Sequence, residues 1–300
     1  MYESLFFAVT AGEPDEDAAD ATGAAAFTFA TFSVIVALGQ MFVVTLGPGN
    51  VDLSIPATIT LAGAVATKVM DTTDAMILPG LLVALLIGVL AGCFNFLLIL
   101  LLRIPPIIAT LSSSFLIQST AIAFGRGLRI KPPPALADFT TAQIHGVPIL
   151  AACTILFTAV MGVVLHRTVY GRWVTAIGQN IRAAHLAGVD VARTRFATYV
   201  LSAVLAGLCG YLLSGFSGGA SLSMGEEYLL TSIAVVVIGG TSVAGGYANV
   251  TGLWGAALFL FLTVTMLNTY GFGAGIRYLA TGLIIIAVIV AASGRRVGRA

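Results

Sequence analysis

The chain has 300 residues, of which 58% are hydrophobic and only 9% charged, and its formal net charge at pH 7 is +1. Soluble domains carry about 25% charged residues, so this composition excludes an ordinary water-soluble fold. The balanced charge, with no basic patch that carries interleaved aromatic residues, also argues against nucleic-acid binding.

Apolar segments follow one another along the chain, most of them near the ~20 residues that a helix needs to cross a bilayer. They predict an all-α fold, a polytopic membrane helical bundle of about eight to nine transmembrane segments within a domain spanning 27–293. An acidic N-terminal segment, 1–26, is expected outside the membrane, with its acidic stretch 13–20 as a solvated loop, and a short tail, 294–300, is expected on the cytoplasmic side. The segments are 27–47, 52–68, 77–102, 104–124, 147–166, 195–217, 228–246, 249–270 and 276–293.

Two of these segments are expected to be irregular. Segment 52–68 begins with Asp52 and has Pro56 near its start, which favours an irregular beginning over a regular lipid-facing helix. Segment 228–246 is short and rich in glycine, which indicates a broken or partial span.

The distribution of lysine and arginine predicts the orientation, because cytoplasmic loops are enriched in these residues. With a cytoplasmic C-terminus, the long polar loop 167–194 is also cytoplasmic, and most basic residues fall inside. The acidic residues then fall outside almost without exception, among them Asp71, Asp74, Asp138, Glu226 and Glu227. The basic residues expected inside are Arg103, Arg167, Arg172, Arg182, Arg193, Arg195, Arg295, Arg296 and Arg299.

Several motifs of enzymes and ATPases are missing from the sequence. There is no GxxxxGK[ST] loop to hold ATP phosphates, and no HExxH, GxSxG or paired histidines with metal spacing. We therefore expect a transport subunit rather than an enzyme, with no metal, no cofactor and no catalytic residue.

The charged residues of the predicted spans, such as Asp52, Arg195 and Arg277, each stand at the end of a span. Proton- or sodium-coupled carriers usually keep such groups at membrane depth. This pattern favours a partner ATPase as the source of energy and leaves an ion-coupled secondary carrier as the alternative.

The loop 167–194 contains the most informative segment of the chain. Its small residues would allow close approach of another protein, and Asn180 is placed to cap a helix that begins near Ile181. A plain amphipathic helix at the membrane surface fits the same pattern. The candidate contact residues are Gly178, Asn180, Ala183, Ala184 and Gly188.

The sequence AIGQNIRAAHLAGVD at 176–190 resembles the cytoplasmic loop of permeases in the ribose-type and branched-chain-amino-acid-type family of ABC importers. Three further segments resemble motifs of the sugar permeases in the same order. They are VTLGPGNVDLS at 44–54, IPPIIATL at 104–111 and IAVVVIGGTSVAGG at 233–246. The first departs from the sugar-permease pattern at residues 48–51, which leaves the solute open.

The resemblance implies the permease subunit of an ATP-binding cassette importer in the cytoplasmic (inner) membrane of a prokaryote. The solute would be a monosaccharide, with branched-chain amino acids as the alternative. The implied partners are membrane lipid, an ABC ATPase subunit, an extracytoplasmic solute-binding protein and a second permease subunit, identical or related. ATP would be used by the ATPase subunit, into which a coupling helix at 181–189 would dock.

Three further sets of residues complete the candidate sites. Asp52 and Ser54 are expected to cap the following helix and order the loop before it, or to line an inner gate. A cytoplasmic glycine turn is either a simple turn or a second contact with a partner, and comprises Gly239, Gly240, Thr241, Gly245 and Gly246. Polar residues inside spans are candidates for the solute path, although hydrogen bonds between packed helices also explain them; they are Gln40, Asn95, Gln118 and Asn268.

Overall fold

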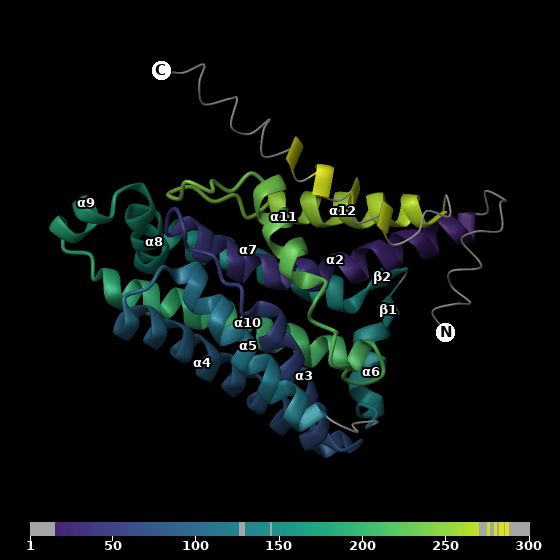
Figure 1. The fold of residues 1–300 in the computed structure, drawn as a ribbon. Helices are drawn as coiled ribbons and strands as arrows, with labels where there is room; N and C mark the ends of the chain where they lie inside the picture. Colours follow the sequence, from purple (N-terminus) through teal and green to yellow (C-terminus); the bar gives the residue numbers. More distant parts are fainter. Residues whose placement is uncertain are drawn as a thin grey trace.

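The computed structural model describes residues 16–125, 130–144 and 146–269, with short stretches at 275–276, 279–280, 282–284 and 286–287. Its helices form one elongated bundle (Figure 1). A small hairpin, β1 (Gln143–Ile144) with β2 (Val147–Pro148), is the sheet of the described part. The helices are α2 (Glu16–Thr45), α3 (Ile55–Met70), the 3-10 turn η1 (Asp74–Met76), α4 (Ile77–Leu102), α5 (Pro106–Gly125), α6 (Pro134–Thr141), α7 (Ile149–Arg167), α8 (Val169–Gln179), α9 (Ile181–Leu186), α10 (Val191–Phe216), α11 (Tyr228–Ile238) and α12 (Gly252–Thr269).

The bundle confirms the predicted all-α membrane fold. Within the described residues, α2, α4, α5, α7 and α10 are long and apolar enough to cross a membrane, and α3, α11 and α12 are shorter apolar helices. These eight helices correspond to the first eight predicted segments. The predicted ninth segment, 276–293, lies largely outside the described residues, and residues 1–15 and the tail 294–300 lie outside them entirely.

The first helix is longer than predicted. α2 begins at Glu16, so residues 16–20 are helical and the loop expected for them is wrong. Six alanines between positions 18 and 26 explain the difference, because alanine has the highest helix propensity of all residues.

Helix α10 lies at the centre of the bundle and packs against α2, α3 and α4. Its contact with α4 brings the two backbones together: a Cβ atom added at Gly92 would lie 2.5 Å from Val200 Cα, and one at Gly88 would lie 2.6 Å from the Ala203 carbonyl oxygen. Glycines four residues apart form such packing faces in membrane helices. The two helices are antiparallel, so each residue of α4 has a known level along α10.

The two predicted irregular segments are irregular in the structure. Residues 46–54, between α2 and α3, form turns, and α3 begins only at Ile55, with Pro56 in its first turn. Helix α11 ends at Ile238 and is followed by turns up to residue 251. A proline fits the first turn of a helix because the amide it lacks has no partner there.

The two ends of the bundle carry different structures. At one end, the α9 end, α8 and α9 lie beside the C-terminal end of α4 (Figure 1), and Arg103 and Arg195 line one cavity there. At the other, the α6 end, α6 lies beside η1, where the Ala135 amide donates to the Asp74 carboxylate at 3.0 Å.

Candidate functional site

The predicted cytoplasmic loop folds into two short helices, α8 and α9. Thr168 caps α8, with its hydroxyl accepting from the Gly171 amide at 3.2 Å. Asn180 caps α9, with Oδ1 accepting from the amides of Arg182 and Ala183, each at 3.0 Å. Both the predicted cap and the predicted start of the helix at Ile181 are confirmed.

Helix α9 has an attached face and a free face. Ala184 is only 4% exposed, whereas Leu186 is 87% exposed. Ala183 and Gly188 are also exposed, and Gly188 adopts a φ of +84° in the turn that ends the helix. The free face is centred on the apolar side chain of Leu186, with the exposed Arg182 one turn before it, and a single chain leaves it uncovered.

Helix α8 is anchored to the bundle by Tyr170. The phenol hydroxyl lies 2.9 Å from Thr198 Oγ1 on α10, and the ring stacks on Phe42 of α2 with centroids 5.9 Å apart. Burial raises the pKa of Tyr170 to about 12, so the hydroxyl stays neutral and able to donate at physiological pH.

Three distant segments meet where α8 ends, and we call this contact the glycine junction (Thr45, Gly47, Gly178, Gly245 and Gly246). A Cβ atom added at Gly178 would lie 1.9 Å from the Thr45 carbonyl oxygen and 2.3 Å from the Gly246 nitrogen. The Gly246 amide donates to the Thr45 carbonyl at 2.9 Å. Gly245 approaches Gly47 as closely, with its added Cβ atom 2.3 Å from Gly47 Cα. The two candidate sites that sequence treated separately are therefore parts of one contact.

The remaining members of the predicted glycine turn lie beside the junction. Asn249 Nδ2 donates to the Gly239 carbonyl at 2.9 Å, and its backbone amide donates to the Thr241 hydroxyl at 3.3 Å. Gly240 has a φ of +90° within this turn. Asn249 thus closes the turn that presents Gly245 and Gly246 to α8, a role that no sequence motif indicated.

A second site lies deeper, around Asp52, and we call it the polar cluster (Gln40, Asp52, Ser54, Asn95, Ser113 and Ser202). Asp52 is 1% exposed. Its Oδ1 accepts from the amide and the hydroxyl of Ser54 at 3.0 and 2.7 Å, and its Oδ2 accepts from the Ser202 hydroxyl at 2.8 Å. Asp52 orders the loop, as expected, but does not cap α3, whose N-cap residue is Ser54 and lacks a side-chain cap bond.

The other members join four helices to the loop. Asn95 Nδ2 of α4 donates to Ser54 Oγ at 2.7 Å, and Ser113 of α5 donates to Asn95 Oδ1. Gln40 Oε1 of α2 accepts from the Asp52 amide at 3.2 Å, while the buried Gln40 Nε2 has no hydrogen-bond partner among the residues that the structure describes. An unpaired buried donor is costly, so Gln40 Nε2 is the unsatisfied group of this otherwise hydrogen-bonded cluster.

Two of the predicted path residues therefore belong to the cluster, and a third does not. Gln40 and Asn95 lie in it. Gln118 instead donates through Nε2 to the Leu222 carbonyl at 3.0 Å. The side chain of Asn268 lies outside the described residues.

The polar cluster lies at membrane depth. Asn95 is seven residues from the end of α4 at Leu102, which corresponds to about 10 Å along the helix. The inference that Asp52 stands at the end of a span is therefore wrong, because the loop 46–54 folds back among the helices. Its burial also removes the sequence argument that the spans hold no ionisable group at depth.

The loop 46–54 joins the two sites along one stripe of α10. Asn50 Oδ1 accepts from the Arg195 guanidinium at 3.2 Å and from the Tyr199 hydroxyl at 3.1 Å. Ser202, which donates to Asp52, follows on the same helical face. Gly47 at the start of this loop belongs to the glycine junction, so the junction and the polar cluster are ends of a single nine-residue loop.

Replacing Asp52 with asparagine should lower the free energy of unfolding by about 1–3 kcal/mol, because an amide cannot accept every hydrogen bond that the carboxylate accepts. Denaturant unfolding of the purified chain in detergent measures this change. Asp138→Asn is the control, since Asp138 is exposed on α6 and should change stability by less than about 0.5 kcal/mol. Equal stability of the two variants would contradict a structural role for the cluster.

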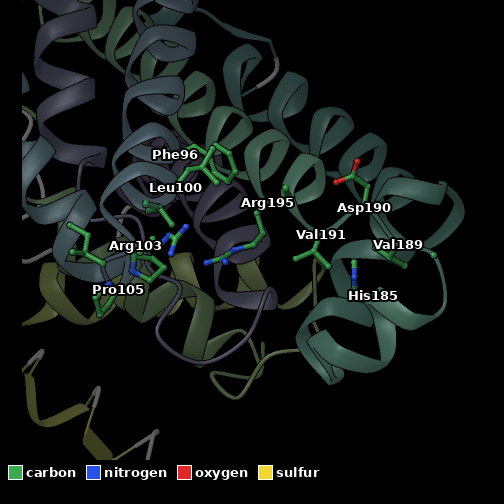
Figure 2. Close-up of a pocket in the computed structure, with 14 residues that line it drawn as sticks. Phe96, Leu100, Arg103, Pro105, His185, Val189, Asp190, Val191 and Arg195 are labelled. Carbon is green, nitrogen blue, oxygen red and sulfur yellow. The ribbon is translucent and has the colours of Figure 1, made fainter.

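A cavity of about 1,040 Å³ opens beside α9 (Figure 2). Its walls come from the end of α4, the turn to α5, and the start of α10. Arg103 and Arg195 both line it, and among the described residues neither pairs with a carboxylate, since Asp190 pairs with Arg193 at 3.1 Å. The lining therefore carries two arginines against the single carboxylate of Asp190, and it reaches α9 and the turn after it through His185 and Gly188.

Comparison with known proteins agrees with this arrangement. The family model described as "Branched-chain amino acid transport system / permease component" matches residues 24–292. The chain is 31% identical over 260 residues to a probable ABC transporter permease protein, y4mJ, of Sinorhizobium fredii, which covers 86% of this chain and 77% of that protein. It is 29% identical to the ribose import permease protein RbsC of Bacillus subtilis, with 85% and 80% covered, and 31% identical to the L-arabinose transport system permease protein AraH of Escherichia coli, with 87% and 79% covered. No solved structure matches.

Proposed function

This chain belongs to the family of branched-chain amino acid transport system permease components, and from that premise we propose that it is the membrane-spanning subunit of an ATP-driven importer for a monosaccharide. The choice of solute is supported by the names of its relatives, which include ribose and L-arabinose permeases. Within the segment 44–54, the residues Asp52, Leu53 and Ser54 match the sugar-permease motif and support the same choice.

The glycine junction is the observation that carries the proposal. An ATPase subunit bound to the free face of α9 would move α8 and α9 together. Because Gly178 leaves no space between α8, Thr45 and Gly246, the backbones are in direct contact. A movement of α8 would therefore displace the loop 46–54 directly, with no flexible side chain between them. The same loop contains Asp52, which lies about 10 Å into the bundle, so the displacement would reach the polar cluster that connects α2, α4, α5 and α10.

The proposed orientation places the α9 end in the cytoplasm. Arg103, Arg172, Arg182 and Arg193 support this side, because basic residues are enriched in cytoplasmic loops. The cavity beside α9 has Arg103 and Arg195 in its lining, so it offers a docking surface for acidic side chains of the ATPase subunit. On the opposite side, a solute-binding protein would deliver the sugar, and a second permease subunit would complete the path.

Uptake by reconstituted vesicles tests the function. The chain is combined with its ATPase and its solute-binding protein, and labelled pentoses, hexoses, leucine and valine are offered with and without ATP. We expect ATP-dependent uptake of one sugar. ATP-dependent uptake of leucine or valine would reject the solute class, and uptake driven by an ion gradient without ATP would reject the importer class.

A further inference from the structure

The segment 217–227 connects α10 to α11 and returns into the bundle after α10 has ended. Gln118 Nε2, in the middle of α5, holds the Leu222 carbonyl at 3.0 Å. A Cβ atom added at Gly63 would lie 2.8 Å from Met224 Cε, and one added at Gly225 would lie 2.0 Å from the Pro56 carbonyl oxygen. The chain therefore descends from the α6 end to the first turn of α3.

The level of Pro56 fixes the depth of this descent. Four residues before Pro56, toward the α9 end, Asp52 accepts a hydrogen bond from Ser202 of α10. Three residues after Pro56, toward the α6 end, the carbonyl oxygen of Ile59 lies 2.2 Å from a Cβ atom added at Gly210 of α10. Pro56 thus lies level with the middle of α10. The short irregular segment ends there, inside the bundle.

The length of α11 gives the same depth independently. Its 11 residues span about 16 Å, roughly half of the ~30 Å hydrocarbon thickness. The helix is followed by the turn whose Gly246 contacts Thr45 at the α9 end. Its first residue, and Glu226 and Glu227 immediately before it, consequently lie near the middle of the membrane. The half-length of α11 thus places these glutamates deeper than the external loop that was expected for them.

The two glutamates cannot face lipid at this depth. Both are exposed, and neither carboxylate bonds to another side chain among the described residues. Charged groups in the hydrocarbon are strongly disfavoured, and irregular backbone at membrane depth occurs only where it is buried in protein or lines water. Since Glu226 and Glu227 are not buried in this chain, water is the environment that the geometry requires.

We propose that 217–227 is a re-entrant segment that lines a water-filled solute path, with Glu226 and Glu227 at its tip accepting hydrogen bonds from the hydroxyl groups of the solute. The chemistry of the solute, a polyhydroxylated neutral molecule, rests on the proposed function. The location of the path does not. Carboxylates are acceptors only, so they suit a solute rich in hydroxyl donors.

Thiol labelling tests the water-filled path without the ATPase or any solute. Glu226→Cys is introduced into a chain whose Cys93, Cys153 and Cys209 are replaced by alanine, reconstituted in vesicles, and exposed to a charged maleimide. Leu86→Cys is the matched control: Leu86 is exposed on α4 between Ala84 and Gly88, which contact Gly207 and Ala203 of α10, so it has nearly the same depth but faces lipid.

Glu226→Cys should react at least about tenfold faster than Leu86→Cys, because the reactive thiolate forms readily in water and is disfavoured in hydrocarbon. Equally slow labelling of both would overturn the proposal, even if the wild-type chain imports a sugar. Equally fast labelling would also overturn it, since Leu86 would then not be a lipid-facing position.

The role of the carboxylates is tested by Glu226→Gln and Glu227→Gln in ATP-driven uptake. We expect each variant to raise the solute concentration for half-maximal uptake by about tenfold, because a hydrogen bond to a charged group is replaced by a weaker neutral one. Transported sugar should also slow the labelling of Glu226→Cys. Unchanged half-saturation together with absent protection would remove the two glutamates from solute recognition.

Discussion

Leu186→Asp should abolish ATP-driven uptake while the chain continues to insert into the membrane at its normal level. Leu186 is 87% exposed at the centre of the free face of α9, so the substitution disturbs no packing within the chain. Placing a charge in the apolar centre of a docking surface costs about 2 kcal/mol or more, which corresponds to at least about 30-fold weaker binding. The affinity of the purified ATPase subunit for the solubilised variant is the direct measurement.

Ile144→Asp is the matched control. Ile144 is 60% exposed on β1, in the connection that follows α6, and should leave the affinity for the ATPase unchanged. Ala184 is a poorer choice for this test, because it is buried and a larger residue there would disrupt the attachment of α9 itself. Wild-type affinity of the Leu186→Asp variant would show that the ATPase docks elsewhere.

Gly178→Val should uncouple ATP hydrolysis from solute uptake without preventing the ATPase subunit from binding. A valine Cβ atom would need the space occupied by the Thr45 carbonyl and the Gly246 amide, so α8 must move away from both. The free face of α9 is unchanged, and the ATPase should still bind. Coupling between two sites is typically worth 1–3 kcal/mol, so its loss should reduce the solute imported per ATP hydrolysed by about 5- to 150-fold.

The ratio of uptake to hydrolysis in the same vesicles measures this effect. Gly255→Val serves as the control, because Gly255 lies on α12 with nothing within 4 Å of an added Cβ atom. If the Gly178→Val variant kept the wild-type ratio, movement would have to reach the bundle by a route other than the glycine junction.

Local features of the fold were predictable from the sequence because they depend on neighbouring residues. Asn180, followed by a helical pattern, indicates an N-cap at that position, and Pro56 indicates where α3 begins. The long apolar runs predict their own helices in the same way. The only sequence signal that α11 spans half the membrane was a short, glycine-rich apolar run. The depth of α11 depends on the contact between Gly225 and Pro56, which no local pattern shows.

The candidate sites were predictable only in part, because their partners are distant in the chain. Asp52 appears in sequence as a residue before a helix, whereas its partners Asn95 and Ser202 lie 43 and 150 positions away. Gly178 and Gly246 were each recognised, but no local pattern indicates that they touch. Asn249, which closes the turn, carries no motif at all.

The hydrogen bond from Gly246 to Thr45 also sets the earliest point of synthesis at which the glycine junction can form. Thr45 ends a helix synthesised early, yet its carbonyl is satisfied by an amide about 200 residues later. At translation rates of about 5–20 residues per second, roughly 10–40 s separate the two partners. Until then α2 ends with an open carbonyl, and the contact on which coupling depends cannot exist. A nascent chain therefore lacks the glycine junction, and the coupling proposed to pass through it, until α11 and the turn after it have been synthesised.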